Sequence, residues 1–536
     1  MTVSPAAERV TDSFIDGEPV RSVGTYPNTD PSTGATLGDV ARAGDKEVDQ
    51  AVAAARRASR AWRATTPEQR SELLSRLAGL IDGEAETLAR LESEDSGKPL
   101  SQARNDARVC ARYFRFYSHV IESYYGLSIP LRPDLHVYTR REPLGVTGHI
   151  VAWNYPMQLF GRAVAPAIAT GNCAVLKPAD ETPRTAVYLA RLAAEAGLPP
   201  GVVNVVTGLG PEAGAALAAH PDVDHLSFVG STEVGRLIAG AAANRVAPVT
   251  LELGGKSAHL VFADADVERA ATTAANVILQ NAGQTCSAGS RLLVDERVHG
   301  QVLQRIAERF GAVTIGPGIT DPDLGPLVSR KQQDRVRGYV DSAGGVGIVY
   351  GGTVAEPDGI TGGAYFNPTL IDGVDPAARI AQEEIFGPVI TVTTFHSEEE
   401  AVALANGTDY ALIGAVWTRD LARAHRVAAQ MDGGQIYVNT YGAGGGVELP
   451  FGGFRKSGYG REKGIEALDA YTATKTIVVQ LLPGGTTPRP PVRARWLRHR
   501  IGRAGTVRRS SMGQDLDADV DVLVVGAGVT GIYQLW

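Results

Sequence analysis

From Val146 to Ala243 the chain repeats one pattern, a short apolar run followed by a segment whose apolar residues have helical spacing. The runs VTGHIVAW, CAVLK, VVNVVTG and HLSFVG alternate with predicted helices over 156–170, 182–196, 212–219 and 232–243. Short strands that alternate with helices need crossover connections, so they favour a largely parallel, doubly wound sheet. Such sheets bind ligands at the carboxyl ends of their strands. The sequence places glycines, an asparagine and a lysine at those ends.

A second series of the same kind follows Cys286, with the runs RLLV, YFNPTLI, PVITVTTF, LIGAVWT and GQIYVN. A chain of 536 residues also exceeds what one hydrophobic core usually supports. The predicted fold class is therefore α/β, with two doubly wound parallel-sheet domains. Outside these series, Thr66-Pro67-Glu68-Gln69 predicts the start of a helix with a capping box, because threonine and glutamine three residues apart can satisfy each other's backbone N–H groups.

Charge and cysteine content exclude several classes of protein. A net charge of −7 argues against nucleic-acid binding, which draws on an excess of Lys and Arg. Only three cysteines occur, with no C-x-x-C, so neither a disulfide framework nor a metal site is indicated. The N-terminus has no signal-peptide pattern, and no apolar run approaches the ~18 residues that a membrane helix needs. We expect a cytoplasmic protein that acts on a small molecule.

One carboxylate and one thiol form a candidate pair of general base and nucleophile. Glu252 ends the apolar run VTLE before a glycine pair, and such a position can raise the pKa of a carboxyl group. Cys286 follows 34 residues later in the loop NAGQTCSAG, where small neighbours leave the thiol uncrowded. The alternative for Glu252 is a buried, paired structural carboxylate. Cys110 and Cys173 are interpreted as inert core cysteines.

Residues at three strand ends are suited to binding a dinucleotide. Gly230 and Ser231 open the helix after HLSFV, where a helix N-terminus favours a phosphate, and Gly210 and Gly214 follow the preceding strand. The alternative is that these small residues form plain turns. Lys177 and Asp180, at the end of CAVLK, can hold a ribose diol between a donor and an acceptor, and the acid disfavours a 2′-phosphate. The alternative is a surface ion pair.

Asn154 lies in the turn WNYP just past a strand. An asparagine amide can donate a hydrogen bond to a developing oxyanion, although a lone asparagine in a turn is usually only a turn residue.

These motifs, taken in order, resemble those of the aldehyde dehydrogenase superfamily from about Phe14 to Leu482. They are WNYP, KPAD, FVGSTEVG, LELGG, GQTC, EEIFGPV and FGGFRKSGYGRE. The resemblance implies a Rossmann-like NAD(P)-binding domain over 1–119 and 144–254 and a catalytic domain over 255–455. It also implies oligomerisation strands over 120–143 and 471–482, and hence a homodimer or homotetramer.

The resemblance assigns roles to individual residues. Cys286 is implied as the nucleophile, Glu252 as the general base, and Asn154 as an oxyanion donor beside the Cys286 backbone amide. Tyr155 is implied to line the substrate tunnel. Implied contacts to NAD, with NADP as the alternative cofactor, come from Trp153, Lys177, Asp180, Gly210, Gly214, Gly230, Ser231, Val234, Leu253, Glu384 and Phe386.

The implied reaction oxidises an aldehyde to a carboxylic acid. The thiolate adds to the aldehyde carbon, hydride passes to the nicotinamide, and the resulting thioester is hydrolysed by a water that Glu252 deprotonates. Alternatives are a CoA-acylating or semialdehyde-specialised member of the superfamily, and a non-catalytic binding protein that keeps the fold. Glu252 argues against the acylating form, because transfer to CoA needs no water-activating base.

Four positions depart from the usual pattern of the superfamily: Ala152 and Arg455, which are expected to be tolerated, and Asp180 and Arg162. Asp180 replaces a glutamate, so its reach to a ribose hydroxyl is shorter. Arg162 replaces a bulky aromatic residue of the substrate tunnel, which leads to the hypothesis that Arg162 binds a carboxylate or polar tail on the aldehyde.

The C-terminal stretch 483–536 is predicted to be a disordered, Arg-rich tail. It ends with Gly526-x-Gly528-x-x-Gly531, which resembles the opening of a flavin-dependent monooxygenase. The chain stops five residues after the third glycine, so the rest of a dinucleotide-binding unit is missing and no working FAD site is expected.

Overall fold

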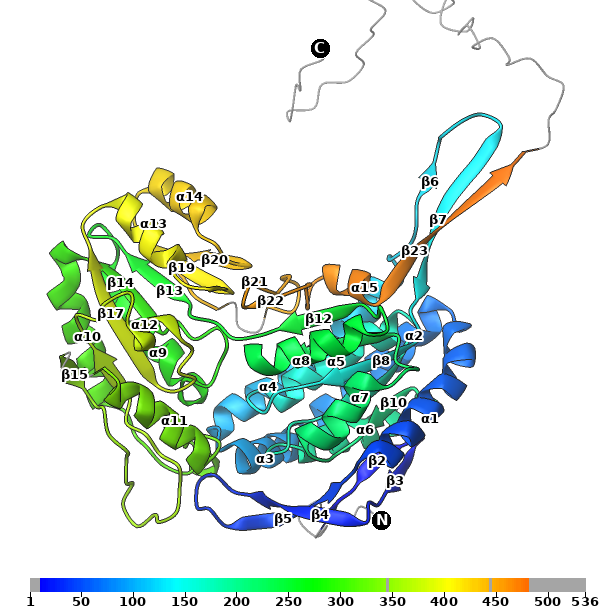
Figure 1. Ribbon diagram of the computed structural model, residues 1–536, viewed down its shortest axis with the longest axis horizontal. Coiled ribbons are helices and arrows are strands. Elements are labelled where there is room, and N and C mark those ends of the chain that lie inside the picture. The colour runs from blue at the N-terminus through cyan, green and yellow to red at the C-terminus, as the bar shows by residue number, and fades with distance from the viewer. Residues whose placement is uncertain (1–9, 344–346, 443–445, 482–536) are drawn as a thin grey trace, which may run out of the picture. The chain divides into compact units, whose positions relative to one another are not determined.

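Eight strands form the first sheet of the computed structural model, in the order β22-β12-β11-β8-β9-β10-β2-β3 (Figure 1). The structure describes residues 10–343, 347–442 and 446–481. The five strands from β12 to β10 are parallel, and the outer strands join antiparallel. The strands are β2 (Ser13–Ile15), β3 (Glu18–Val20), β8 (Val146–Ile150), β9 (Cys173–Lys177), β10 (Val203–Val205), β11 (His225–Val229), β12 (Val249–Glu252) and β22 (Gly458–Tyr459).

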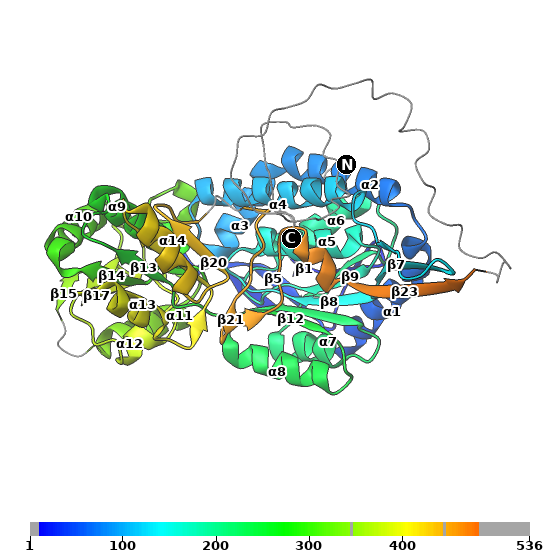
Figure 2. The same ribbon diagram turned by 90° about the horizontal axis from the view of Figure 1, so that it is seen from above.

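Helices cover both faces of this sheet, which is why its central strands are buried throughout. Figure 2 shows α7 and α8 on one side and α2 and α4 on the other. The helices are α1 (Asp45–Arg63), α2 (Pro67–Gly83), α3 (Ala85–Ser96), α4 (Leu100–Ile121), α5 (Pro156–Ala169), α6 (Arg184–Glu195), α7 (Ala215–Ala219), α8 (Thr232–Ala243) and α15 (Glu466–Ala470), with a π-helical turn η2 (Gly210–Gly214). The predicted capping box of α2 is present, since Thr66 and Gln69 bond each other's backbone N–H groups at 3.2 and 2.9 Å.

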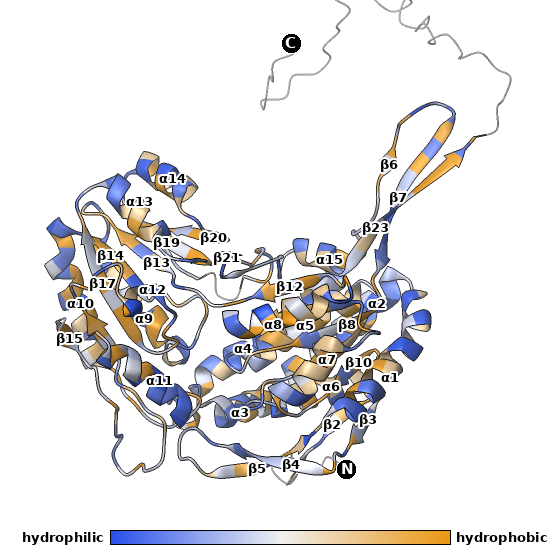
Figure 3. Cartoon of the chain, viewed as in Figure 1, coloured by the Kyte–Doolittle hydropathy of each residue, from blue (hydrophilic) through white to orange (hydrophobic). Residues whose placement is uncertain are grey.

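The second sheet has seven strands in the order β15-β16-β17-β14-β13-β19-β20, and only β15 is antiparallel. Most residues of its central strands are apolar (Figure 3). The strands are β13 (Ala258–Val261), β14 (Arg291–Asp295), β15 (Ile348–Tyr350), β16 (Thr369–Ile371), β17 (Val389–Phe395), β19 (Ile413–Trp417) and β20 (Gln435–Val438).

Alternate residues of β14 pack into two different cores. Leu292 and Val294 pack with α9 and α10, whereas Leu293 packs with α13 and α14. Because side chains alternate along a strand, the two helix pairs cover opposite faces of the sheet. The helices are α9 (Val267–Leu279), α10 (His299–Gly311), α11 (Arg330–Asp341), α12 (Arg379–Gln382), α13 (Glu398–Asn406) and α14 (Leu421–Gln430), with 3₁₀ turns η3 (Gln280–Gly283), η4 (Glu296–Val298) and η5 (Gly318–Thr320).

Three small sheets complete the fold. The sheet of β23, β7 and β6 exposes most of its residues, apolar ones included. The strands are β1 (Val10–Thr11), β4 (Gly24–Thr29) and β5 (Thr36–Arg42); β18 (Tyr410–Ala411) and β21 (Phe454–Arg455); and β6 (Ser128–Ile129), β7 (Leu135–Pro143) and β23 (Thr472–Gln480).

Strand register brings the predicted site residues to one edge of the first sheet. Glu252 pairs with Val229, Phe228 with Ile150, and Ile150 with Lys177. The carboxyl ends of these parallel strands therefore meet, although almost eighty residues separate Lys177 from Glu252.

The predicted α/β class with two parallel sheets is confirmed. Every strand of the second sheet falls in the predicted catalytic range 255–455, but β22 of the first sheet lies beyond it. The domain boundaries themselves stay a prediction. The predicted tail, with its glycine remnant, lies outside the described residues.

Candidate active site

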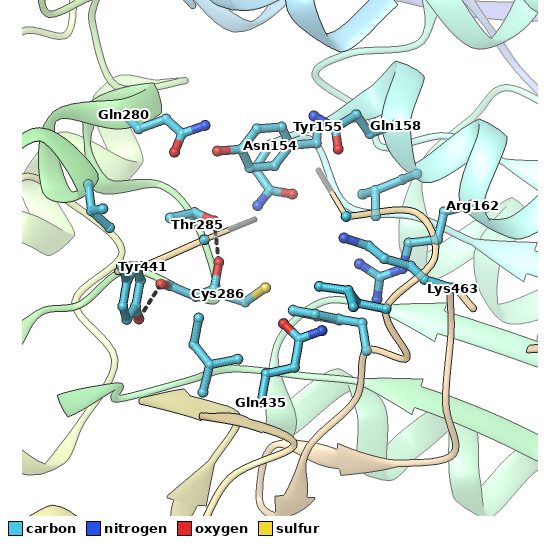
Figure 4. A pocket seen from close by; sticks show the side chains of 18 of the residues that line it. Asn154, Tyr155, Gln158, Arg162, Gln280, Thr285, Cys286, Gln435, Tyr441 and Lys463 are labelled. Carbon is cyan, nitrogen blue, oxygen red and sulfur yellow. Dashed lines mark hydrogen bonds between the residues drawn. The ribbon is translucent and has the colours of Figure 1, made fainter. Parts of the chain in front are cut away.

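Cys286 lies on the wall of a cavity of about 340 Å³ (Figure 4). The thiol is partly exposed, unlike those of Cys110 and Cys173, which are buried. Asn154, Tyr155 and Arg162, all predicted from the sequence, line the same cavity. The other lining residues are Asn105, Tyr113, Gln158, Leu159, Val229, Val277, Gln280, Thr285, Ser287, Ile413, Gln435, Tyr437, Tyr441, Gly442, Gly446, Leu449, Phe451 and Lys463.

A sharp turn after α9 leads the chain into the Cys286 loop. Asn281, Ala282 and Gly283 have φ values of 48°, 53° and 69°, a region that residues with side chains rarely adopt. The Asn281 backbone N–H donates to the Gln102 side chain at 2.9 Å, which helps to hold the turn. A Cβ on Gly283 would lie 2.1 Å from a backbone carbonyl oxygen, so this position requires glycine.

The glycine pair after Glu252 lets the end of β12 approach this loop. A Cβ on Gly255 would lie 2.1 Å from the carbonyl oxygen of Cys286. The small residues of LELGG therefore bring the base-bearing strand and the thiol-bearing loop into direct backbone contact.

Asn154 is held with one amide N–H already engaged. Its Nδ2 donates to the Gln284 carbonyl at 3.0 Å, and Asn281 Nδ2 donates to the Asn154 carbonyl at 2.9 Å. An asparagine amide has two N–H groups. The second N–H is therefore available to a ligand in the cavity. This position favours a binding role for Asn154 over a role as only a turn residue.

A buried charged cluster supports the turn that carries Asn154. Lys98 Nζ lies 2.6 Å from Glu92 Oε1, contacts Asp106 and lies 4.1 Å from the centre of the Tyr155 ring. Glu92 Oε2 accepts the Met157 backbone N–H at 3.2 Å, in the first turn of α5. Burial raises the pKa of Glu92, and the Lys98 charge opposes this. The start of α5 is thus tied to helices α3 and α4.

Glu252 is 2% exposed and forms an ion pair with Arg162, whose Nη2 lies 2.9 Å from Glu252 Oε2. Within the described part of the chain, Glu252 Oε1 has no hydrogen-bond partner, and Oε2 is held by Arg162. Burial raises the pKa of Glu252, and Arg162 opposes this. Glu252 is absent from the lining of the Cys286 cavity, whereas Arg162, its ion-pair partner, is part of it.

Burial and the Glu252 charge raise the pKa of Cys286 to about 12, and Arg162 works in the opposite direction. A thiol in this environment needs a base or a nearby cation before it can attack a substrate.

Lys177 and Asp180 form an ion pair at the end of β9, as the sequence suggested. This pair is not a simple surface contact, because Lys177 is buried and Asp180 Oδ2 also accepts the Gly210 backbone N–H at 3.2 Å. A Cβ at Gly210 or Gly214 would meet no atom within 4 Å. Open space therefore adjoins a fixed pair of polar groups, and a ribose fits their donor and acceptor chemistry.

At the end of β11 the N-terminus of α8 is exposed. Ser231 Oγ caps the helix by accepting the Val234 backbone N–H at 3.3 Å, and the Val234 side chain is 40% exposed. Such an N-terminus fits a diphosphate. Leu253 packs against the backbone of Gly235, 2.6 Å from where a Cβ would lie. Gly230 serves packing, since its missing Cβ would meet the Phe228 ring at 2.5 Å.

Glu384, Phe386 and Trp153 lie at the junction of the two sheets' loops. Glu384 Oε1 accepts the Gly255 backbone N–H at 2.9 Å, and burial raises the pKa of Glu384 to about 7. The rings of Trp153 and Phe386 meet edge to face, 5.2 Å between centres. Glu384 therefore holds the glycine pair beside Cys286, while Trp153 and Phe386 contact each other across the two sheets' loops.

Sequence reasoning missed Glu462 and Lys463. Glu462 contacts Arg162, and Lys463 lines the cavity. Glu462 was visible only as the last letter of FGGFRKSGYGRE, where no spacing connects it to Arg162, 300 residues earlier.

The two doubly wound sheets and this cavity place the chain among the α/β enzymes. The aldehyde dehydrogenase family model matches residues 19–477. An aldehyde dehydrogenase from Alternaria alternata is 42% identical over 482 residues, which covers 88% of this chain and 96% of the relative. The chain belongs to the aldehyde dehydrogenase family.

Solved structures agree with this assignment. A protein from Burkholderia cenocepacia, provisionally called an aldehyde dehydrogenase, is 48% identical, with a TM-score of 0.86 over 88% of this chain and all of that chain. Betaine aldehyde dehydrogenase from Staphylococcus aureus, solved with NAD⁺, is 36% identical, with a TM-score of 0.86 over 88% of this chain and 96% of that one. The predicted family and enzyme class, an NAD(P)-dependent aldehyde dehydrogenase, are confirmed.

Proposed function

We propose that this chain oxidises an aldehyde to the free carboxylic acid with NAD⁺ as the hydride acceptor, through a thioester on Cys286. The observation that carries the proposal is the shared cavity of Cys286 and Asn154 beside the carboxyl edge of the first sheet. When bound, the nicotinamide supplies the two-electron oxidation; the chain's own residues supply the rest.

Cys286 gives its proton to solvent water, and its sulfur bonds to the aldehyde carbon as the carbonyl π electrons move to oxygen. The oxygen that becomes negative accepts hydrogen bonds from the free N–H of Asn154 and the backbone N–H of Cys286. Arg162 and Lys463 lower the pKa of Cys286, so their positive charges favour the thiolate.

Hydrolysis of the thioester is assigned to Glu252. Its carboxylate takes a proton from water, the water oxygen bonds to the thioester carbon, and the Cys286 sulfur leaves as a thiolate. A carboxylate with a raised pKa, and with one oxygen, Oε1, that has no hydrogen-bond partner among the described residues, suits this task. The same carboxylate supports a hydrolytic over a CoA-acylating enzyme, because CoA needs no water-activating base.

For the cofactor, the proposal assigns Lys177 and Asp180 to the adenosine ribose and the N-terminus of α8 to the diphosphate. Asp180 supports NAD over NADP, because its charge repels a 2′-phosphate. Glu384 and Phe386 are assigned to the nicotinamide ribose. Tyr155 belongs to the proposed substrate tunnel.

A panel of aldehydes with NAD⁺ and NADP⁺, followed at the absorbance of the reduced cofactor, tests the proposal. We expect aldehyde-dependent reduction with a higher kcat/KM for NAD⁺, and free acid as the product with or without CoA. Absence of reduction with every aldehyde, or an acyl-CoA product, would overturn it.

We also propose that the chain forms a homo-oligomer through the sheet of β6, β7 and β23. Leu127, Leu131 and Val478 are 69%, 63% and 57% exposed on or beside these strands. Apolar side chains grouped at a sheet edge favour association with another copy. A cytoplasmic location is supported by the three free cysteines.

A further inference from the structure

Arg162 bridges two carboxylates that come from distant parts of the chain. Its Nη2 lies 2.9 Å from Glu252 on β12, and its Nε contacts Glu462, which follows β22. The side chains of Arg162, Glu252 and Glu462 are 7%, 2% and 3% exposed. Ion pairs so deeply buried are coupled much more strongly than surface pairs.

Around the Arg162 guanidinium, two carboxylates compete for one positive charge. Glu252 and Glu462 share one guanidinium, and Ser227 Oγ donates to Glu462 Oε1 at 3.0 Å. The other titratable groups that act on Glu252 are Lys463, in the loop after β22, and Cys286, in the loop before β14. Burial lowers the pKa of Lys463 to about 8, so Lys463 loses its charge as the pH rises above neutral, whereas Arg162 keeps its own.

An arginine is suited to this place because it stays charged at every pH at which the protein is folded. It therefore gives a constant attraction to the Glu252 carboxylate, whereas Lys463 gives one that fades with rising pH. Arg162 also lines the Cys286 cavity. Its Cζ lies 4.8 Å from the centre of the Phe451 ring, and this contact helps to orient the guanidinium.

We propose that Arg162 is the positioning residue of the general base: it pins the Glu252 carboxylate, and Glu462 weakens that hold by competing for the same guanidinium. This inference rests on the proposed role of Glu252. It differs from the hypothesis that Arg162 binds a carboxylate tail of the substrate, because two protein carboxylates already occupy the guanidinium.

The two partners act on Glu252 with opposite sign. Arg162 lowers the pKa of Glu252, and Glu462 raises it. Loss of the arginine charge therefore keeps Glu252 protonated to higher pH, and loss of the Glu462 charge frees it at lower pH. A protonated Glu252 cannot take a proton from water, so the hydrolytic step follows these shifts.

The test compares pH profiles of steady-state turnover and of the first burst of NADH in Arg162→Met, Arg162→Lys and Glu462→Gln. We expect the acidic limb of turnover to move up by about one pH unit or more in Arg162→Met, a loss of roughly fivefold or more at the wild-type midpoint. It should move down in Glu462→Gln and return toward wild type in Arg162→Lys. All three should keep a burst, which should be slower in Arg162→Met because the Arg162 charge also favours the Cys286 thiolate. Arg90→Met removes an arginine from an exposed pair with Glu86 and should leave the profile unchanged.

Shifts in the same direction for Arg162→Met and Glu462→Gln, or no shift in either, would overturn the proposal. A KM increase confined to carboxylate-bearing aldehydes in Arg162→Met, with an unmoved pH limb, would assign Arg162 to the substrate instead. Failure of the proposed function is distinguishable, because Glu252→Gln would then turn over at the wild-type rate whatever the Arg162 variants do.

Discussion

At the scale of single residues, the structure separates the groups that face the cavity from those that act behind them. Cys286 and Asn154 line the cavity, whereas Glu252 does not line it and pairs with Arg162, which does. The proposed nucleophile and base therefore belong to different steps, and their variants should fail differently.

Cys286→Ala removes the atom that bonds to substrate, so we expect no aldehyde-dependent NADH at any time after mixing. Glu252→Gln leaves the thiol in place and removes the base. We therefore expect a first burst of about one NADH per site, followed by steady turnover lowered by roughly 10²–10⁴-fold. Stopped-flow absorbance measures the burst and the steady rate in each variant. A Glu252→Gln enzyme with full steady turnover refutes the role of Glu252.

Gly255→Ala tests the backbone contact between β12 and the Cys286 loop. The new Cβ would lie 2.1 Å from the Cys286 carbonyl oxygen, so the loop must move. We expect a cost of about 1–3 kcal/mol in the free energy of unfolding, together with a lower burst rate. Urea unfolding and stopped-flow kinetics check this, with Gly44→Ala, which meets nothing within 4 Å, as the control. Equal stability of the two variants contradicts the prediction.

At the scale of elements, the cap residue and first two turns of α5 bring Tyr155, Gln158 and Arg162 to the cavity. Helix α4 packs against α5, and Glu92 of α3 accepts the Met157 backbone N–H. Their anchor is Lys98, which is completely buried between Glu92 and Asp106. This cluster links the position of the cavity wall to the packing of the helical layer.

Lys98→Met leaves two buried carboxylates without their cation. We expect a loss of about 3–5 kcal/mol in the free energy of unfolding, because breaking a buried pair exposes the full desolvation cost of the remaining charge. Chemical denaturation measures it. Arg90→Met, which breaks a pair of exposed side chains on α3, should change stability by less than about 0.5 kcal/mol. Similar losses in both variants would rule out the buried cluster as the cause.

At the scale of the whole molecule, two parallel sheets bring their loops together, and buried polar groups make the fold depend on pH. His225 is buried on β11 beside β8, and burial lowers its pKa to about 3.

No helix in the described ranges is both long and apolar enough to cross a bilayer.

His225→Gln should flatten the pH dependence of stability. The folded His225 stays neutral down to about pH 3, whereas the unfolded side chain binds a proton below about 6.5. The unfolded state therefore gains protons as pH falls through this window, and wild-type stability decreases by about 1.4 kcal/mol per pH unit from this group alone. Urea unfolding at pH 6 and 5 should show a slope smaller by one proton in the variant. Identical slopes contradict the prediction.

The exposed sheet of β6, β7 and β23 gives a prediction for the assembly. Leu131→Glu with Val478→Glu puts charges on apolar positions that are 63% and 57% exposed in the single chain. We expect a smaller assembly by sedimentation velocity, with the far-UV spectrum unchanged, because a charge disfavours strand-to-strand association. An unaltered sedimentation coefficient would place the interface elsewhere.

Local patterns in the amino-acid sequence were enough to predict the elements and the motif residues. The strand CAVLK became β9, the capping box of Thr66 formed, and the family followed from short motifs in order. Each of these depends on neighbours within a few residues, such as strand periodicity or a cap, which a linear pattern records.

Contacts between distant residues were decided only by the tertiary structure. The sequence suggested a substrate carboxylate as the partner of Arg162, but the packing of α5 against the end of β12 and the segment after β22 supplies Glu252 and Glu462. The same packing keeps Glu252 out of the cavity lining and ties Lys98 to the turn of Asn154 and Tyr155. A buried charge is stabilised by whichever opposite charge the fold places beside it, and no spacing along the chain encodes that partner.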